Sequence, residues 1–431
     1  MYGLVDGNNF YVSCERAFQA RLEKAPVVVL SNNDGNIISR SAEAKALGLG
    51  MGDPYFQVKP LLQQHGVRVL SSNYPLIGDM SRRMMHCLAA MAPEIEIYSV
   101  DEAFLNLHGM ERYFGNLAVY GQTIRATVRQ RVRIPTCVGI APTKTLAKLA
   151  NRLAKKTPAL DGVCYLDSPA RCAWAREQTA VEDVWGVGHQ YAVKLHEAGI
   201  RTAADLAQCS EAWARRHLGG VVGVRLIREL NGSPCVGMLP SEDGTLARQR
   251  IAYTRSFGTP LSDFADLSGA VSAFTSRAAE KLRRQGSAAN TLSIFISKNR
   301  YGTEPPPYTF STVITLPGAT NDTGDLLRHA RAALKRLWRP GTVYKKAGVI
   351  LDGLETAGQQ QLNLFAPTNH GEVRDKLLAD VDALNRRYGA GTVGFAAALA
   401  TQGSLRAPWL GKADFRSAAY TTNWHELWAV R

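Results

Sequence analysis

The first 166 residues alternate between short apolar strand patterns and amphipathic helical patterns. In the strand patterns the apolar residues occupy every second position or one continuous run, and in the helical patterns they recur three and four positions apart. We expect strands at residues 1–5, 26–30, 37–39, 94–97, 104–107 and 136–140, and helices at residues 10–18, 40–47, 76–92, 117–132 and 143–157. This part of the chain is therefore predicted to mix helices with sheet.

The stretch EIEIYSVDEAFLNL, residues 94–107, places two neighbouring carboxylates between two strand patterns. Its first half alternates glutamate with isoleucine, and we expect the isoleucines to lie on the buried face. Asp101 and Glu102 then interrupt the pattern. Two adjacent carboxylates at the end of a strand disfavour each other's ionised form, and a divalent cation removes that cost. The alternative is an ordinary solvated turn.

Asp6 provides a third carboxylate at a strand end. It follows the strand predicted at residues 1–5 and precedes turn-forming residues that lead into the first helix. Three carboxylates at the ends of strands suit magnesium, which prefers oxygen ligands and keeps places for water and substrate phosphates. Two such ions can hold the attacking and leaving oxygens of a phosphoryl transfer.

Basic residues are concentrated on the helix predicted at residues 143–157. Lys144, Lys148 and Lys155 fall on a different side from its leucines, and the helix contains no glutamate. Because it begins at a strand end, its lysines are expected near the same sheet edge as the carboxylates, where phosphates would approach. Lys45, on the helix predicted at 40–47, is a further candidate phosphate contact, although a solvated charge is the alternative.

Net charge points to a polyanionic partner. The chain has 51 Lys and Arg against 37 Asp and Glu, a formal charge of +14, which favours association with nucleic acid. No basic amphipathic helix with an aromatic face supports binding to anionic lipid.

No apolar run approaches the roughly 20 residues needed to span a bilayer, and the seven scattered cysteines form no CxxC pair. We therefore expect a cytoplasmic protein with reduced cysteines and no membrane association.

Two later regions carry further candidate DNA contacts. Residues 167–235 read as short helices and glycine turns, and Gly186 and Gly188 lie in a sequence typical of a helix-hairpin-helix, whose backbone amides receive a DNA phosphate. An ordinary helical hairpin is the alternative. Residues 241–355 combine strand and helix patterns with an excess of basic residues, and Arg255 is a candidate for contact with the DNA backbone.

With these features the chain resembles the Y-family lesion-bypass DNA polymerases, and within them the UmuC branch, over essentially its whole length. The matching segments are DGNNFY (6–11), SNNDGNIISRSAEAKALGLGMGDP (31–54), YSVDEAF (98–104), VGIAPTKTLAKLANRLAKK (138–156), VWGVG (184–188), QLNLF (361–365) and YTTNW (420–424). YSVDEAF together with the Asp6 motif is highly specific, whereas the helix-hairpin-helix is shared by many DNA-binding proteins.

The resemblance implies an α+β multidomain fold with the right-hand architecture of a polymerase. The expected domains are a palm at residues 1–24 and 76–166, small fingers at 25–75, a helix-hairpin-helix thumb at 167–236, a little finger at 241–355 and a C-terminal tail at 356–431. It also implies that Asp6, Asp101 and Glu102 bind two Mg²⁺ ions, with the Gly7 carbonyl completing one shell.

The resemblance also implies a nucleotide site. Tyr11 would exclude a ribose 2′-OH, and the Phe10 and Tyr11 amides with Lys45 and Lys155 would meet the triphosphate. Where many Y-family members have an aromatic residue before the Glu-Ala-Lys element, this sequence has Ala42, so one phosphate contact is lost and Ser39 is the candidate substitute.

The implied activity is error-prone, template-directed addition of dNTPs to a primer opposite damaged DNA, as part of the SOS response to DNA damage. Implied partners besides primer-template DNA are a processed UmuD-type dimer and the RecA filament, in the bacterial cytoplasm at the nucleoid. A noncatalytic DNA-binding repair scaffold is the main alternative, and an intact set of carboxylates beside an intact lysine helix argues against it. A two-metal nuclease lacks an obvious water-activating His or Lys.

The segment Gln361-Leu362-Asn363-Leu364-Phe365 resembles the pentapeptide by which bacterial polymerases bind the β sliding clamp. It follows the last strand predicted for the little finger and lies in a Gln-rich linker. Two leucines and a phenylalanine can fill an apolar groove as a small anchor cluster. The alternative is that they fold back onto the little finger.

Overall fold

The computed structural model describes residues 1–431 except 240–247, 300–304, 359–370, 390, 399–408 and 428–431. The chain forms two compact units. The first comprises Met1–Ser31, Gly35–Leu246 and Phe415–Arg431, and the second comprises Asn32–Asp34 and Ala247–Asp414. The last described residues therefore belong to the unit that contains the first strand.

A five-stranded sheet forms the centre of the first unit, in the order β5-β6-β1-β7-β8. Its strands are β1 (Tyr2–Gly7), β5 (Glu94–Ile97), β6 (Glu102–Asn106), β7 (Thr136–Ala141) and β8 (Val163–Tyr165). The central strand β1 is antiparallel to both β6 and β7, and β8 runs parallel to β7. The strands expected at residues 1–5, 94–97, 104–107 and 136–140 are thereby confirmed.

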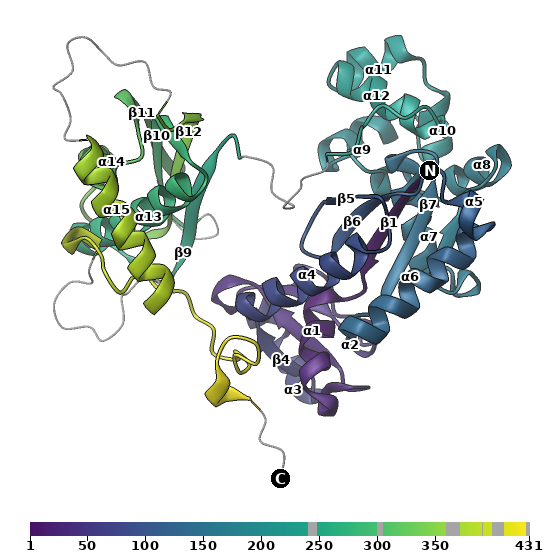
Figure 1. The fold of residues 1–431 in the computed structure, drawn as a ribbon, viewed down its shortest axis with the longest axis horizontal. Helices are drawn as coiled ribbons and strands as arrows, with labels where there is room; N and C mark the ends of the chain where they lie inside the picture. The colour runs from purple at the N-terminus through teal and green to yellow at the C-terminus, as the bar shows by residue number, and fades with distance from the viewer. Residues whose placement is uncertain (240–247, 300–304, 359–370, 390, 399–408, 428–431) are drawn as a thin grey trace. The chain divides into compact units, whose positions relative to one another are not determined.

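Helices cover both faces of this sheet (Figure 1). They are α1 (Phe10–Phe18), α4 (Tyr74–Ala89), α5 (Glu111–Phe114), α6 (Leu117–Val132) and α7 (Lys144–Lys156). Successive side chains along each strand point to opposite faces of the sheet, so each face has its own core. Val5 and Leu105 pack with the methionine stripe of α4, whereas Leu4 and Phe104 pack with the leucines of α7. The helix expected at residues 76–92 is therefore present, and its methionines belong to a core.

A smaller three-stranded sheet lies in the same unit, in the order β3-β2-β4. Its elements are η1 (Ala20–Leu22), β2 (Val27–Leu30), β3 (Ile37–Arg40), α2 (Ala42–Ala46), α3 (Tyr55–Gln64) and β4 (Arg68–Ser71). The turn between β2 and β3 contains η2 (Asn32–Asp34), which is assigned to the second unit. Strands β2 and β3, expected at residues 26–30 and 37–39, form an antiparallel hairpin, and β4 is parallel to β2. Asn33 and Asp34 adopt positive φ angles in the connecting turn, a conformation that Asn and Asp tolerate better than most residues.

Short helices follow the large sheet. They are η3 (Pro158–Leu160), α8 (Pro169–Glu177), η4 (Val181–Asp183), α9 (His189–Glu197), α10 (Ala203–Gln208), α11 (Glu211–His217) and α12 (Val221–Leu230). Their apolar residues join the α7 core. The buried Glu229 connects these short helices to α7. Its carboxylate accepts hydrogen bonds from the Thr145 amide at 3.1 Å and from the Cys235 amide at 2.6 Å. The helical region is thereby tied to the start of α7.

The second unit is a four-stranded antiparallel sheet with helices, in the order β11-β10-β12-β9. Its elements are β9 (Ile251–Leu261), α13 (Phe264–Arg284), β10 (Ser287–Ser297), β11 (Thr309–Thr320), α14 (Thr323–Leu337), β12 (Tyr344–Thr356), α15 (Gly371–Tyr388) and η5 (Ala396–Ala398). The apolar faces of α13 and α14 pack on the sheet in one core. The combination of strands and helices expected for residues 241–355 is therefore present.

The mixed helical and strand architecture with several domains agrees with the predicted fold class. The expected boundaries between palm, fingers, thumb and little finger stay predictions. The expected tail, residues 356–431, is divided: α15 belongs to the second unit, whereas residues from Phe415 onward, including η6 (Trp424–Glu426), belong to the first. Among the residues that the structure describes, no helix is long and apolar enough to cross a membrane.

Candidate active site

The pairing of β1 with β6 brings together carboxylates that are about a hundred residues apart in sequence. Asp6 lies directly opposite Glu102 in the antiparallel register. Asp101 precedes β6, and its carbonyl accepts a hydrogen bond from the Gly7 amide at 2.8 Å. The backbone thus places three carboxylate residues at one end of two neighbouring strands, as the sequence predicted for its strand ends.

Ser99 organises the turn that carries two of these carboxylates. Its hydroxyl donates to Asp101 Oδ1 at 2.6 Å and accepts from the Glu102 amide at 3.1 Å. A Ser side chain that bonds backbone two or three residues ahead is a common way to stabilise a turn. Sequence analysis missed this role, and the spacing Ser-x-Asp-Glu was the available signal.

Two lysines of α7 neutralise the carboxylates. Lys155 Nζ lies 2.5 Å from Asp6 Oδ2, and Lys148 Nζ lies 3.0 and 3.2 Å from the two oxygens of Glu102. Both lysines lie on one face of the helix because they are two turns apart. The expectation that this helix presents ammonium groups at the carboxylate edge is therefore confirmed for Lys148 and Lys155.

Asp6 is nearly buried, at 9% exposure, and this controls its charge. Burial raises the pKa of its carboxyl to about 7, and the nearby charges of Glu102 and Asp101 act in the same direction, while Lys155 opposes them. With a pKa of about 7 the carboxyl is partly protonated near neutral pH even beside Lys155, so a further cation close by would favour its ionised form. The site therefore favours a cation at Asp6.

Lys144 corrects one prediction. Its side chain is completely buried, and its ammonium binds the Glu96 carboxylate and the Gly237 carbonyl, the latter at 2.7 Å. The DNA contact expected of Lys144 is therefore wrong in this structure, because the ammonium has no exposed surface. The same pair reverses the expected faces of β5: Glu96 points inward at 9% exposure, and Ile97 is 40% exposed.

Three aromatic rings surround the Lys148 ammonium. It lies 4.3 Å from the ring centroid of Tyr98, 5.6 Å from Trp185 and 6.0 Å from Phe104, distances at which ring faces attract a cation. Trp185 also donates from Nε1 to the Tyr98 hydroxyl at 3.0 Å. Sequence analysis missed this cluster, which holds Lys148 beside Glu102 and restricts it as a DNA contact.

The N-terminus of α1 forms a second candidate binding feature next to Asp6. Asn9 precedes the helix in a left-handed conformation without capping it through its side chain, so the first helical amides, at Phe10 and Tyr11, lack the partners that helix interiors provide. Such amides bind phosphate. Lys45 Nζ lies 2.6 Å from Asn9 Oδ1, where burial, Arg40 and Lys155 lower its pKa.

The remaining predicted nucleotide contacts surround the same helix. The Phe10 ring is buried in the core, and the half-buried Tyr11 ring meets it edge to face with centroids 6.5 Å apart. Burial raises the pKa of the Tyr11 hydroxyl, with Tyr74 and Asp101 adding to the shift. Ser39 Oγ, also buried, lies 3.5 Å from the Val12 amide. The residues predicted for one triphosphate site thus gather around the start of α1.

The donor set fits a hard divalent cation, although its side chains are not gathered around one point. Within the part of the chain that the structure describes, no three His, Cys, Asp or Glu side chains lie close enough together to hold a metal ion. Lys155 pairs with Asp6 instead, and Lys148 pairs with Glu102. Carboxylate oxygens on neighbouring strands are the kind of donor that magnesium prefers.

The predicted DNA contacts outside the palm are exposed. Gly186, with a φ of 95°, and Gly188 lie in the turn before α9, and a Cβ at either position would meet no atom within 4 Å. Both glycines are therefore exposed, with open space on the side where a side chain would lie. Arg255, on the edge strand β9, is exposed, with its guanidinium 5.3 Å from the Tyr253 ring centroid. The pentapeptide predicted to bind the clamp, residues 361–365, lies outside the described residues.

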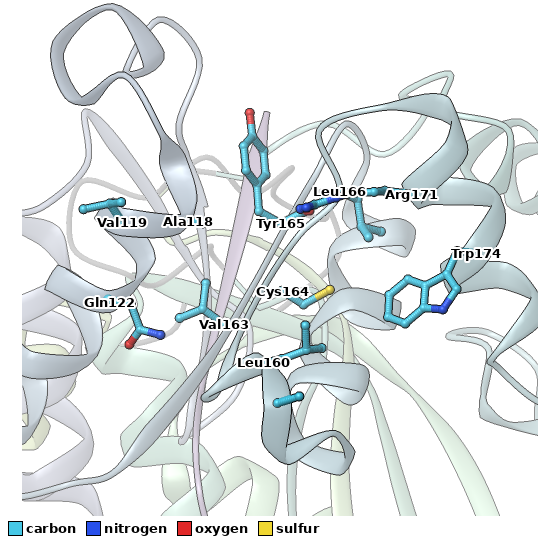
Figure 2. Close-up of a pocket in the computed structure, with 11 residues that line it drawn as sticks. Ala118, Val119, Gln122, Leu160, Val163, Cys164, Tyr165, Leu166, Arg171 and Trp174 are labelled. Atoms are coloured by element: carbon cyan, nitrogen blue, oxygen red, sulfur yellow. The ribbon is translucent and has the colours of Figure 1, made fainter.

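A cavity of about 530 Å³ lies at a different place in the first unit (Figure 2). It lies against the edge strand β8, between α6 and α8, and its lining includes Val119, Tyr165 and Trp174. Figure 2 shows mostly apolar side chains around it. None of the predicted site residues lines it, so the chemistry has to be sought at the carboxylates.

Comparison with known proteins assigns most of the chain. Residues 5–152 match the impB/mucB/samB family, residues 248–364 match the C-terminal domain of that family, and residues 375–430 match a domain of unknown function. The chain is 42% identical to Protein UmuC of Salmonella typhimurium, covering 100% of both chains. It is 38% identical to Protein MucB of Escherichia coli over 99% of both, and 26% identical to DNA polymerase IV of Moorella thermoacetica over 93% of this chain and 97% of that one.

Solved structures share the fold. A chimera of the Y-family DNA polymerases Dbh and Dpo4 superimposes with a TM-score of 0.69 at 18% identity, covering 82% of this chain and 99% of its own. The insertion ternary complex of Dbh DNA polymerase gives a TM-score of 0.55 with the same coverage. The multidomain architecture expected from the sequence is therefore that of known proteins.

Proposed function

Because the chain belongs to the impB/mucB/samB family of Y-family DNA polymerases, we propose that Asp6, Asp101 and Glu102 form the catalytic centre of an error-prone translesion polymerase. The activity itself, template-directed DNA synthesis past damage, follows from the family. The proposal assigns it to residues. Its main support is the register that places Asp6 opposite Glu102 while the Gly7 amide binds the Asp101 carbonyl.

These three carboxylates, with the Gly7 carbonyl, would hold two Mg²⁺ ions. Bound there, magnesium would supply Lewis acidity toward the primer 3′-OH and the phosphate oxygens. The 3′-OH attacks the α-phosphate of the dNTP, the bond from the α-phosphorus to the oxygen that bridges to the β-phosphate breaks, and pyrophosphate leaves. Asp6 would contribute a carboxylate that a nearby cation keeps ionised, because its pKa is about 7.

Lys155, Lys45 and the first amides of α1 bind the triphosphate. They gather around Asn9 and Asp6, so the phosphates would lie between the helix N-terminus and α7. Lys155 then exchanges its carboxylate partner for a phosphate oxygen. Ser39 is buried, and its hydroxyl lies 3.5 Å from the Val12 amide in the first turn of α1. It therefore supports this end of the helix and affects phosphate binding indirectly.

Tyr11 selects the sugar. Its ring lies in the first turn of α1, next to the triphosphate site, where it would oppose C2′ of the incoming nucleotide and exclude a ribose hydroxyl. The DNA backbone is contacted by the exposed turn at Gly186 and Gly188 and by Arg255, with Lys148 held at the carboxylate edge. Backbone contacts suffice, because the template strand supplies the sequence information.

The partners are proposed from the sequence. The β sliding clamp would bind Gln361, Leu362, Asn363, Leu364 and Phe365. A processed UmuD-type dimer and the RecA filament complete the proposed assembly, which would act in the bacterial cytoplasm at the nucleoid. The noncatalytic scaffold is less favoured, because the similarity to Protein UmuC and to DNA polymerase IV extends over almost the whole chain.

Primer extension by Glu102→Gln tests the catalytic assignment. The variant keeps the size of the side chain and the Lys148 contact but removes the charge, so we expect loss of nucleotide addition with DNA binding unchanged. Glu94→Gln is the matched control: it lies on the same sheet, and its carboxylate binds Asn106 at 2.8 Å instead of the catalytic edge. Extension by Glu102→Gln at the level of Glu94→Gln would rule out the assignment.

A further inference from the structure

The segment Phe415–Leu427, which we call the C-terminal strap, packs on the first unit. It begins at the end of β4, where the Ser71 amide donates to the Phe415 carbonyl and the Phe415 amide donates to Ser71 Oγ, each at 3.0 Å. The Phe415 ring meets Tyr55 of α3 edge to face, with centroids 5.6 Å apart. The strap is thus anchored first to the small sheet.

Its next contacts are with two buried polar side chains. Asn73, 1% exposed, donates from Nδ2 to Ser417 Oγ at 2.8 Å and to the Ala418 carbonyl at 3.1 Å. The Ser417 hydroxyl donates in turn to Glu15 Oε1 at 2.7 Å, and Glu15 is also 1% exposed. A buried polar group without a partner costs about 1–3 kcal/mol, so these residues require the strap.

An aromatic stack completes the attachment. Tyr420, 6% exposed, lies parallel to Phe18 with centroids 5.1 Å apart and an interplanar angle of 3°. Beyond it the strap closes on itself, because the Glu426 carboxylate accepts the Ala419 amide at 2.6 Å and Asn423 Nδ2 at 2.7 Å. The strap is therefore a folded element with a defined position.

These contacts fall on the helix that carries Tyr11. Glu15 and Phe18 follow Tyr11 by four and seven positions, so the three side chains lie along one face of α1. The strap holds the second and third of them. It also holds Asn73, which immediately precedes Tyr74, and Tyr74 is close enough to Tyr11 to influence the pKa of its hydroxyl. Both the helix behind Tyr11 and the residue beside it are thus braced.

We propose that the C-terminal strap is a positioning element for Tyr11 and thereby a determinant of sugar selection. By fixing α1 through Ser417 and Tyr420, it sets how closely the Tyr11 ring approaches C2′ of the incoming nucleotide. The inference rests on the proposed function of Tyr11. It gives a role to part of residues 375–430, which match only a domain of unknown function.

The test measures kcat and KM for a dNTP and for the matching rNTP, using the full-length chain in the assembly in which the wild type extends primers. Tyr420→Ala and Ser417→Ala remove the two contacts, Tyr420→Phe retains the stacked ring, and Trp424→Ala is the control on an 86% exposed strap residue. We expect the ratio of kcat/KM values, dNTP over rNTP, to fall about tenfold in Tyr420→Ala, since small displacements near reacting atoms are costly. Tyr420→Phe and Trp424→Ala should keep the wild-type ratio.

A double variant tests whether the strap acts through Tyr11. In a Tyr11→Ala background, Tyr420→Ala should cause no further loss of selectivity, because the residue being positioned is gone. If Tyr11→Ala lowers selectivity but neither strap variant does, the strap inference is wrong while Tyr11 keeps its proposed role. If Tyr11→Ala leaves selectivity unchanged, both assignments fail. Equal losses for dNTP and rNTP with a lowered melting temperature would overturn the inference and show a purely structural strap.

Discussion

Lys155 Nζ and Asp6 Oδ2 lie 2.5 Å apart, so a residue expected to bind the triphosphate is paired with a residue expected to bind metal. The pair joins the end of β1 to the last turn of α7. The two partners differ in exposure, because the Asp6 side chain is 12% exposed and the Lys155 side chain is 36% exposed. The lysine is the partner with freedom to move, which makes an exchange from carboxylate to phosphate feasible.

Lys155→Ala should weaken nucleotide use with little effect on DNA affinity. Loss of a charged hydrogen bond to the triphosphate, worth about 1.5–3 kcal/mol, corresponds to a decrease of roughly 10- to 150-fold in kcat/KM for dNTP. Lys156→Ala is the matched control, because that neighbouring lysine is 60% exposed and faces Asp183. Steady-state single-nucleotide insertion measures the effect, and equal kcat/KM values for the two variants would contradict the triphosphate role.

Lys144→Met should destabilise the fold and leave the affinity for DNA unchanged. It leaves the Glu96 carboxylate buried and unpaired, which typically costs about 3–5 kcal/mol. The melting temperature is therefore expected to fall, and the double variant Lys144→Met with Glu96→Gln should recover part of the loss because no unpaired charge remains. A variant with unchanged stability but reduced DNA binding would restore the original expectation for Lys144.

The thermal stability of the chain should depend on pH through Glu15. Burial raises the pKa of this carboxyl above its ordinary value of 4.5, with the Ser417 and Gln19 hydrogen bonds opposing the shift. Between 4.5 and the raised value the folded protein holds a proton that the unfolded chain has released, so this contribution to stability falls as pH rises through that range.

Glu15→Gln removes that contribution. The difference in melting temperature between variant and wild type should therefore grow in favour of the variant from about pH 4.5 upward. Glu23→Gln applies the same chemical change to an exposed residue and should run parallel to the wild type. Parallel curves for Glu15→Gln and wild type would show that Glu15 keeps its ordinary acidity.

Replacing Leu364 and Phe365 with Ala should weaken binding to the β sliding clamp and shorten processive extension. The two side chains are the proposed apolar anchors, and anchor residues dominate peptide affinity. Insertion of a single nucleotide on a short primer, together with the melting temperature, should stay at the wild-type level. Loss of insertion or stability with clamp binding retained would mean that the segment belongs to the folded body.

Sequence patterns predicted the helices and strands well because each element has a local cause. The leucine repeat of α7 and the methionine stripe of α4 recur at helical spacing, and both face cores. The carboxylate edge was also accessible to prediction, because Asp6, Asp101 and Glu102 each border a strand. Features with a purely local origin were therefore predictable from the sequence.

Partners brought together by tertiary pairing were not predictable in this way. In β5 the alternation alone favoured buried isoleucines, but an ion pair with Lys144 turned Glu96 inward. The attachment of Ser417 to Glu15 joins residues 402 positions apart, and neither residue indicates it in sequence. Such long-range choices depend on which surfaces meet, which periodicity does not encode.

Because Glu15 and Ser417 are 402 positions apart, their contact can form only late in the synthesis of the chain. A ribosome adding about 5–20 residues per second delivers Ser417 roughly 20 to 80 s after Glu15. The large sheet has all its strands once Tyr165 has emerged, long before Ser417 exists. Until then the Glu15 carboxylate and the Asn73 amide lack their strap partners. A chain released before residue 415 would carry all three carboxylates beside an unbraced α1, so on the proposed role of the strap it would admit ribonucleotides more readily.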